Sequence, residues 1–138
     1  MTPAPGKRQS CNISKTVLIV DDEPDLLRLT AVRLQKAGYE VQMASDGRTT
    51  FKFLEKGKTD LVLLDFQLPD LTGEDICKKI RQHETFKHIP VVVISAVADI
   101  GQLSELVKTA GAQGCLAKSV DPQGLLDCIG QLLKRVQS

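Results

Sequence analysis

Short apolar runs alternate along this chain with segments of helical pattern, and four of the runs end in residues that can hold a phosphate or a metal. These terminal residues are Asp21-Asp22, Asp65, Ser95 and Lys118. Short apolar runs bounded by polar residues are typical of strands buried in a parallel sheet. The ligand site of an open α/β sheet lies beyond the carboxyl ends of its strands. These residues therefore lie where the ligand site of such a fold is expected.

The alternation predicts five strands and five helices from residue 16 onward. The strands are expected at 16–21, 40–44, 60–65, 90–95 and 114–117, and the helices at 24–37, 47–57, 73–83, 99–111 and 122–136. Local signals agree, because prolines suit a first helical turn and short polar side chains cap it. These signals are Pro24, Ser45 or Asp46, Thr72, Asp121 and Pro122. Five such units predict an α/β fold, a flavodoxin-like doubly wound parallel sheet in the order 2-1-3-4-5 with helices on both faces.

Composition supports one globular domain. The chain has 138 residues, of which 42% are hydrophobic and 25% charged. Residues 1–15 lack periodicity and contain Pro3, Pro5 and Gly6, so we expect a flexible N-terminal leader followed by a folded domain at 16–138. A net charge of +1 gives no field that calls for nucleic acid or a membrane surface, and no apolar run approaches the length of a membrane span.

The four cysteines show no spacing typical of a metal site. Cys77, Cys115 and Cys128 have apolar neighbours and are interpreted as small buried hydrophobic residues. Free thiols of this kind fit a reducing compartment, so we expect the protein to be cytoplasmic.

The predicted strand order brings the acids together. Strands one and three are neighbours, so Asp21, Asp22 and Asp65 leave the sheet at one point, with Ser95 and Lys118 on the next two strands. Clustered carboxylates repel one another, and a divalent cation removes that cost. A ligand set of oxygens alone favours Mg²⁺. The ammonium of Lys118 and the hydroxyl of Ser95 suit the oxygens of a phosphoryl group beside Asp65.

Taken singly, these residues have ordinary structural interpretations. An acidic pair before Pro24 is more often a helix cap, and a lone lysine is more often solvated. The joint arrangement at matching strand ends is what favours a site. His83 and His88 lack a partner acid or nucleophile and are interpreted as structural. Gly73 is interpreted as easing a turn or helix packing.

Together the motifs Asp21-Asp22-Glu23, Asp65 with Pro69 and Gly73, Ser95-Ala96 and Lys118 resemble the receiver domain of two-component response regulators, over residues 16–137. The resemblance implies that Asp65 accepts a phosphoryl group from a phosphohistidine on a sensor histidine kinase or phosphotransfer protein. It implies Mg²⁺ bound by Asp22 and Asp65 directly, by Asp21 through water and by the backbone carbonyl of Gln67.

The resemblance also assigns the remaining roles. Ser95 matches the switch hydroxyl and Lys118 the phosphate-binding lysine. Such a domain shifts between inactive and active conformations that a downstream effector or output domain reads. It catalyses only its own phosphorylation and slow dephosphorylation, so it is not a metabolic enzyme. A homodimer through the face of the fourth helix, fifth strand and fifth helix is compatible with the resemblance.

Two positions depart from the family pattern. Cys115 stands where the family usually has an aromatic that rotates on activation, so this chain does not support that form of the switch. Ser119 stands where a proline usually follows the lysine. A cis bond before a residue other than proline costs about 2.5–4 kcal/mol, so Lys118 either carries that strain or is placed by another route.

The same residues suggest three rival functions. An aspartyl-phosphate phosphohydrolase of the haloacid dehalogenase type typically needs a second aspartate at the position of Gln67. A receiver-like interaction module that is never phosphorylated would not need suitable chemistry at every site position. A flavodoxin-like cofactor binder would need a phosphate-binding loop and aromatics to stack on the ring, whereas the chain has five aromatic residues, none of them tryptophan.

Overall fold

A single parallel sheet forms the centre of the molecule. The computed structural model describes residues 15–66, 68–96, 105, 108–118 and 121–137. Its strands are β1 (Thr16–Val20), β2 (Glu40–Ala44), β3 (Leu61–Asp65), β4 (Val91–Ser95) and β5 (Gly114–Ala117). They pair in parallel in the order β2-β1-β3-β4-β5, which confirms the predicted topology.

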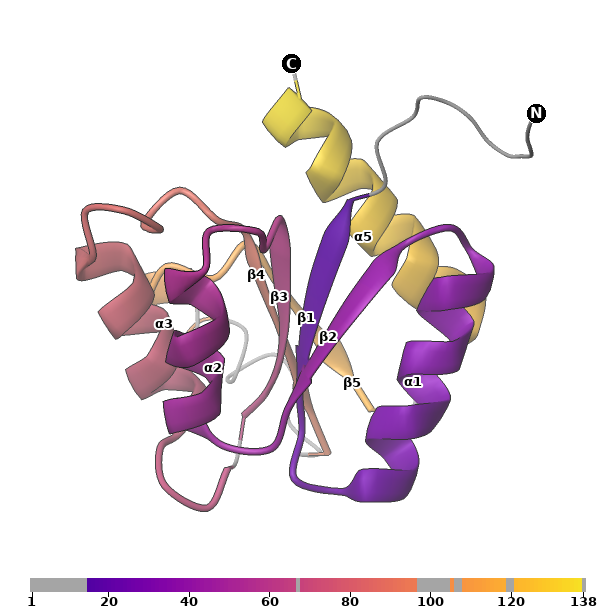
Figure 1. Cartoon of the computed structure of the whole chain (residues 1–138), viewed down its shortest axis with the longest axis horizontal. Coiled ribbons are helices and arrows are strands. Elements are labelled where there is room, and N and C mark those ends of the chain that lie inside the picture. The colour runs from indigo at the N-terminus through magenta and orange to yellow at the C-terminus, as the bar shows by residue number, and fades with distance from the viewer. Residues whose placement is uncertain (1–14, 67, 97–104, 106–107, 119–120, 138) are drawn as a thin grey trace.

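Helices cover both faces of this sheet. They are α1 (Pro24–Lys36), α2 (Gly47–Glu55), α3 (Gly73–Gln82) and α5 (Pro122–Gln137). Figure 1 shows α1 and α5 on one face and α2 and α3 on the other. The predicted helix at 99–111 falls largely outside the described residues, although Glu105, Lys108 and Thr109 are helical.

The helix caps follow from local side-chain chemistry. Asp46 accepts a hydrogen bond from the Thr49 amide at 2.8 Å, and the side chain of Asp121 accepts one from Gly124 at 2.7 Å. Thr72 and Asp75 form a reciprocal capping box at the start of α3. Gly38 follows α1 with φ of 101°, the left-handed conformation that ends a helix most easily at glycine. The sequence signals thus mark the helix ends to within one or two residues.

The strand residues alternate between two apolar layers. One layer packs against α2 and α3 and includes Leu18, Val62 and Leu64. The other packs against α1 and α5 and includes Val17, Ile19, Leu61 and Leu63. All of these side chains are nearly or fully buried. Burial on both faces explains why the inner strands β1, β3 and β4 are almost entirely apolar rather than alternating, whereas the edge strand β2 contains exposed Glu40. Among the helices that the structure describes, none has both the length and the hydrophobicity needed to cross a bilayer.

Candidate functional site

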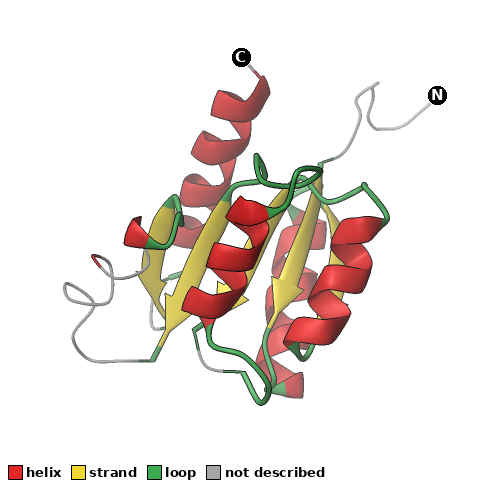
Figure 2. Ribbon diagram, turned by 90° about the vertical axis from the view of Figure 1, so that its left-hand side faces the viewer, coloured by secondary structure: helices red, strands yellow, loops and turns green. Residues whose placement is uncertain are grey.

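Three carboxylates from two neighbouring strands meet beyond the carboxyl edge of the sheet. Asp21 and Asp22 follow β1, and Asp65 is the last residue of β3. One oxygen of each lies within 4.8 Å of the others. Asp21 is 7% and Asp65 is 6% exposed, whereas Asp22 is exposed to solvent. The structure therefore brings together the three acids, as the strand order predicts, and Asp22 is the one that faces solvent. Figure 2 shows the strands running to this common edge.

Asp21 also organises the start of α1. Its backbone amide donates to the Ala44 carbonyl at 3.0 Å, which extends the contact between β1 and β2 by one residue. Its Oδ1 accepts a hydrogen bond from the Glu23 amide at 2.9 Å. The helix-capping interpretation and the site interpretation are thus compatible. Oδ1 orders the turn, and Oδ2 lies 3.5 Å from Nζ of Lys118.

Lys118 supplies a positive charge to this cluster. Its backbone amide donates to the Ser95 carbonyl at 2.9 Å, which fixes the residue after β5 against the end of β4. Its side chain is 18% exposed, and Nζ lies 3.2 Å from Oδ2 of Asp65 and 3.5 Å from Oδ2 of Asp21. A further contact joins Nζ to Oε1 of Glu23 at 3.0 Å.

The environment holds the Lys118 ammonium in its charged form. Burial lowers its pKa, but the hydrogen bond with Glu23 and the charges of Asp65 and Asp21 outweigh burial, so the pKa is raised above its usual value. The lysine therefore stays protonated throughout the physiological pH range. It can offer three N–H donors to anionic oxygens.

Asp22, Asp65 and Lys118 share a cleft with the predicted hydroxyl. This cleft has a volume of about 440 Å³, and Ser95, which is 2% exposed, lies in its wall. The other lining residues are Asp22, Glu23, Asp65, Leu68, Pro69, Ala96 and Lys118. Carboxylate oxygens, an ammonium and a hydroxyl thus line one solvent-accessible space. Gln67, predicted to offer its carbonyl to the metal, lies outside the described residues.

The loop after Asp65 is held by contacts that the sequence did not reveal. The Asp70 carboxylate accepts hydrogen bonds from the amides of Gly47 and Arg48, at 2.8 and 3.2 Å, at the start of α2. Gly73 packs so closely that a Cβ there would lie 2.9 Å from Cα of Phe66. The prediction that Gly73 serves packing is confirmed, because a side chain would push against the backbone beside Asp65.

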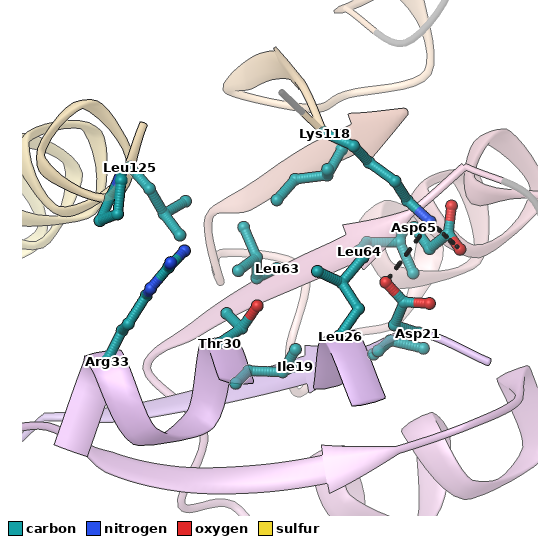
Figure 3. Close-up of a pocket in the computed structure, with 13 residues that line it drawn as sticks. Ile19, Asp21, Leu26, Thr30, Arg33, Leu63, Leu64, Asp65, Lys118 and Leu125 are labelled. Atoms are coloured by element: carbon teal, nitrogen blue, oxygen red, sulfur yellow. Dashed lines mark hydrogen bonds and ion pairs between the residues drawn. The ribbon is translucent and has the colours of Figure 1, made fainter. Parts of the chain in front are cut away.

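A small cavity lies on the inner side of the ion-pair cluster. It measures about 50 Å³ and lies between α1 and α5, with Asp21, Asp65 and Lys118 at one end (Figure 3). The side chains of Leu26, Thr30, Arg33 and Leu125 are among those that line it. This space suits a few water molecules and is far smaller than the pocket of a ring-containing cofactor.

The two departures from the family pattern differ in what the structure describes. Cys115 pairs with Val93 of β4 and is partly buried against the core on the side of α2 and α3. Burial raises the pKa of its thiol, so it is a poor nucleophile. Ser119 lies outside the described residues. Cys77, Cys115 and Cys128 are free thiols.

The sequence did not indicate that Glu23 and Asp70 take part in the site. The motif Asp21-Asp22-Glu23 includes Glu23, but nothing in its local pattern indicated a contact with Lys118. Asp70 has no local signal at all, because its partners lie 22 and 23 residues earlier.

Comparison with known proteins identifies the family. The model of the response regulator receiver domain matches residues 17–130. The chemotaxis protein CheY-3 of Vibrio cholerae is 33% identical over 126 residues, which cover 91% of this chain and 96% of CheY-3. The DNA-binding dual master transcriptional regulator RpaA of Synechocystis is 33% identical over 121 residues, covering 86% of this chain and 49% of RpaA. The chain thus spans nearly all of one relative and about half of the other.

Solved structures agree with the sequence relatives. A putative response regulator from Chloroflexus aurantiacus superposes with a TM-score of 0.83 at 33% identity, covering 88% of this chain and 99% of that structure. The chemotaxis response regulator CheY4 of Vibrio cholerae gives a TM-score of 0.80 at 29% identity, covering 86% and 98%. With its strand order, its acid cluster and these relatives, the chain belongs to the response regulator receiver domain family of two-component signalling.

Proposed function

We propose that Asp65 is the phosphoacceptor of this receiver domain and that Lys118 and Ser95 bind the oxygens of the transferred phosphoryl group. The observation that carries the proposal is the convergence of Asp65 with two other acids and one lysine beside an open cleft that Asp65 and Lys118 line. One Asp65 oxygen attacks phosphorus in line, and the bond from phosphorus to the donor nitrogen breaks. The donor histidine leaves as a neutral imidazole once it has a proton. Later attack of water on phosphorus breaks the bond to the Asp65 oxygen, which restores the carboxylate and releases inorganic phosphate.

The donor atoms of the acid cluster fit Mg²⁺. Three carboxylates supply hard oxygen ligands, and an exposed one, Asp22, leaves the site accessible to the hydrated ion. We assign Asp22 and Asp65 as direct ligands, Asp21 as a ligand through water and the Gln67 backbone carbonyl as the remaining protein ligand. Bound there, Mg²⁺ would neutralise charge on the phosphoryl oxygens.

The chain's own residues then set the geometry of transfer. Asp65 is almost completely buried at a strand end, so its carboxylate has few alternative positions. Lys118 donates to Asp65 before the reaction, and after it the same ammonium can donate to a phosphoryl oxygen. Ser95 lies in the cleft wall and can donate its hydroxyl. This exchange of partners biases the domain between its two conformations.

The family relationship also supports a domain layout, a location and a set of partners. We propose a receiver domain at 16–138 preceded by a leader at 1–15, a cytoplasmic location, and partners that are a histidine kinase or phosphotransfer protein and an effector. We propose that the domain contacts neither nucleic acid nor a membrane directly and catalyses only its own phosphorylation and dephosphorylation. The family relationship supports these roles, and the free thiols suit a reducing compartment.

The direct test is incubation with phosphoramidate, with and without Mg²⁺, followed by intact mass measurement. The wild-type chain should gain one base-labile, acid-stable phosphate in the presence of Mg²⁺, and Asp65→Asn should gain none. Asp127→Asn is the matched control, since it makes the same change at an exposed acid on α5. Equal labelling of wild type and Asp65→Asn, or labelling that ignores Mg²⁺, contradicts the proposal.

A further inference from the structure

Glu23 occupies the N-cap position of α1 but does not act as a cap. Its side chain makes no hydrogen bond to the helix amides, and glutamate is not among the residues that cap well. Instead its Oε1 accepts a hydrogen bond from Nζ of Lys118 at 3.0 Å, across a sequence separation of 95 residues. The side chain is 64% exposed, so it reaches the ammonium from the solvent side of the cleft.

This contact adds a third carboxylate to the partners of Lys118 among the described residues. The ammonium has three N–H donors, and three carboxylates lie around it. The distances from Nζ are 3.0 Å to Glu23, 3.2 Å to Asp65 and 3.5 Å to Asp21. The contacts with Glu23 and Asp65 are hydrogen bonds, whereas Asp21 forms an ion pair at the longer distance. A phosphoryl oxygen on Asp65 would compete with Glu23 for the N–H donors on this side of the ammonium. Glu23 is by far the most exposed of the three, so water replaces its lost hydrogen bond most easily.

The charge of Glu23 acts in the same direction as its hydrogen bond. Glu23 lines the same cleft as Asp65, which the phosphoryl group of a donor must enter. Like charges in one cleft repel, and the effect is moderate because the carboxylate is largely solvated. Both effects oppose the entry of an anionic donor.

We propose that Glu23 is a positioning residue that holds Lys118 before phosphorylation and slows the reaction by competing with the incoming phosphoryl group for the ammonium. The inference rests on the proposed function of Asp65 and Lys118. It assigns to Glu23 a role in setting how readily this domain accepts phosphate, without contact with the reacting atoms.

The test compares phosphorylation rates at saturating Mg²⁺ over a range of phosphoramidate concentrations. The chain has no tryptophan to report the reaction by fluorescence, so quenched samples are measured by intact mass. Glu23→Gln should raise the apparent second-order rate constant roughly two- to five-fold, as expected for loss of one largely exposed ion pair. The gain should come from a lower donor concentration at half-maximal rate, with the maximal rate little changed.

Two further variants separate contact from charge. Glu23→Asp keeps the charge but shortens the side chain by one methylene, so it should give an intermediate rate. Asp25→Asn removes the same charge two residues away, at a fully exposed side chain that pairs with Arg28, and should leave the rate unchanged. An equal increase in Asp25→Asn would mean a general charge effect and overturn the inference, as would an unchanged rate in Glu23→Gln.

A second measurement needs neither metal nor donor. A double-mutant cycle of Glu23→Gln with Lys118→Met, by urea unfolding in a chelator, should show coupling between the two side chains, and the same cycle with Asp25→Asn should show none. Absence of coupling between Glu23 and Lys118 overturns the inference. A wild-type chain that takes up no phosphate overturns the proposed function, whereas normal wild-type labelling with an unchanged Glu23→Gln rate overturns only the role of Glu23.

Discussion

Nζ of Lys118 lies 3.2 Å from Oδ2 of Asp65, although the two residues are 53 positions apart in the chain. The contact joins the ends of β3 and β5, with β4 between them in the sheet. Both side chains are mostly buried, at 18% and 7% exposure. An ion pair in this position is screened less by solvent than a surface pair. The ion pair therefore holds the Lys118 ammonium within reach of the oxygens of a phosphoryl group on Asp65.

Replacing Lys118 by methionine should slow phosphorylation by phosphoramidate on the order of 100-fold at saturating Mg²⁺, because a positioned donor to the developing charge is lost. Labelling rates measured by intact mass give the comparison. Lys118→Arg keeps the charge in a different geometry and should recover only part of the loss. A methionine variant that labels at the wild-type rate contradicts the assignment of Lys118.

Asp22 provides a test of the metal site that does not depend on phosphorylation. Adding Mg²⁺ at about 100 times its dissociation constant should stabilise the wild-type chain by about 2.7 kcal/mol. Asp22→Asn removes a ligand and should abolish most of this effect. In a chelator the same variant should be at least as stable as wild type, since one repulsion in the cluster disappears. Urea unfolding at constant ionic strength measures both, and equal Mg²⁺ stabilisation of the two chains contradicts the site.

Gly73 and Gly130 form a matched pair of glycine-to-alanine substitutions. Gly73→Ala should cost about 1–3 kcal/mol, because the new Cβ would lie 2.9 Å from Cα of Phe66, which is backbone and cannot move aside cheaply. It should also slow labelling of Asp65, whose carbonyl lies 3.3 Å from that Cβ. Gly130→Ala meets only the Tyr39 hydroxyl at 3.9 Å and should stabilise α5 by about 0.5–1 kcal/mol. Denaturant unfolding of both variants checks the opposite signs.

Arg81 holds together three segments through neutral acceptors. Its Nε donates to the Gly111 carbonyl at 2.8 Å, and its Nη1 to the carbonyls of Lys87 and Ile89 at 2.8 and 2.7 Å. Its Nη2 donates to the side chain of Gln113. Arg81→Met leaves these acceptors without their donor, so we expect a loss of roughly 2–4 kcal/mol in unfolding free energy.

The control for Arg81 lies one turn earlier on the same helix. Lys78 forms an exposed ion pair with Glu74 four residues before it, at 2.9 Å. Such surface pairs contribute little, so Lys78→Met should hardly change stability. Similar losses in the two variants would show that the Arg81 contacts add nothing beyond surface charge.

The buried thiol of Cys77 predicts a stability change at alkaline pH. Burial raises its pKa to about 12 from the ordinary 9.0. Between these values the native state keeps a proton that the unfolded state loses, so stability falls as pH rises from about 9 toward 12. The stability difference between wild type and Cys77→Ala should therefore shrink over this range. Urea midpoints at pH values from 7 to 11 measure it. A constant difference contradicts the assignment.

The sequence alone determined the elements and the site acids. Apolar runs mark the inner strands because both sheet faces are covered. Pro24, Thr72 and Asp121 mark helix starts because they satisfy or avoid free amides within one turn. Once the general strand order of such sheets is applied, the convergence of Asp21 and Asp65 follows. These signals are local, since each depends on neighbours within a few positions.

Which distant side chains meet depends on long-range packing. Glu23 reaches Lys118, Asp70 caps α2, and Arg81 spans to Gly111, across separations of 95, 23 and 30 residues. Each of these side chains has a common local interpretation, as a solvated charge or a turn residue. Their partners depend on how loops and helices pack over the sheet, and no local propensity encodes that packing. The acid cluster could therefore be predicted from the sequence, whereas the contacts of Glu23, Asp70 and Arg81 could not.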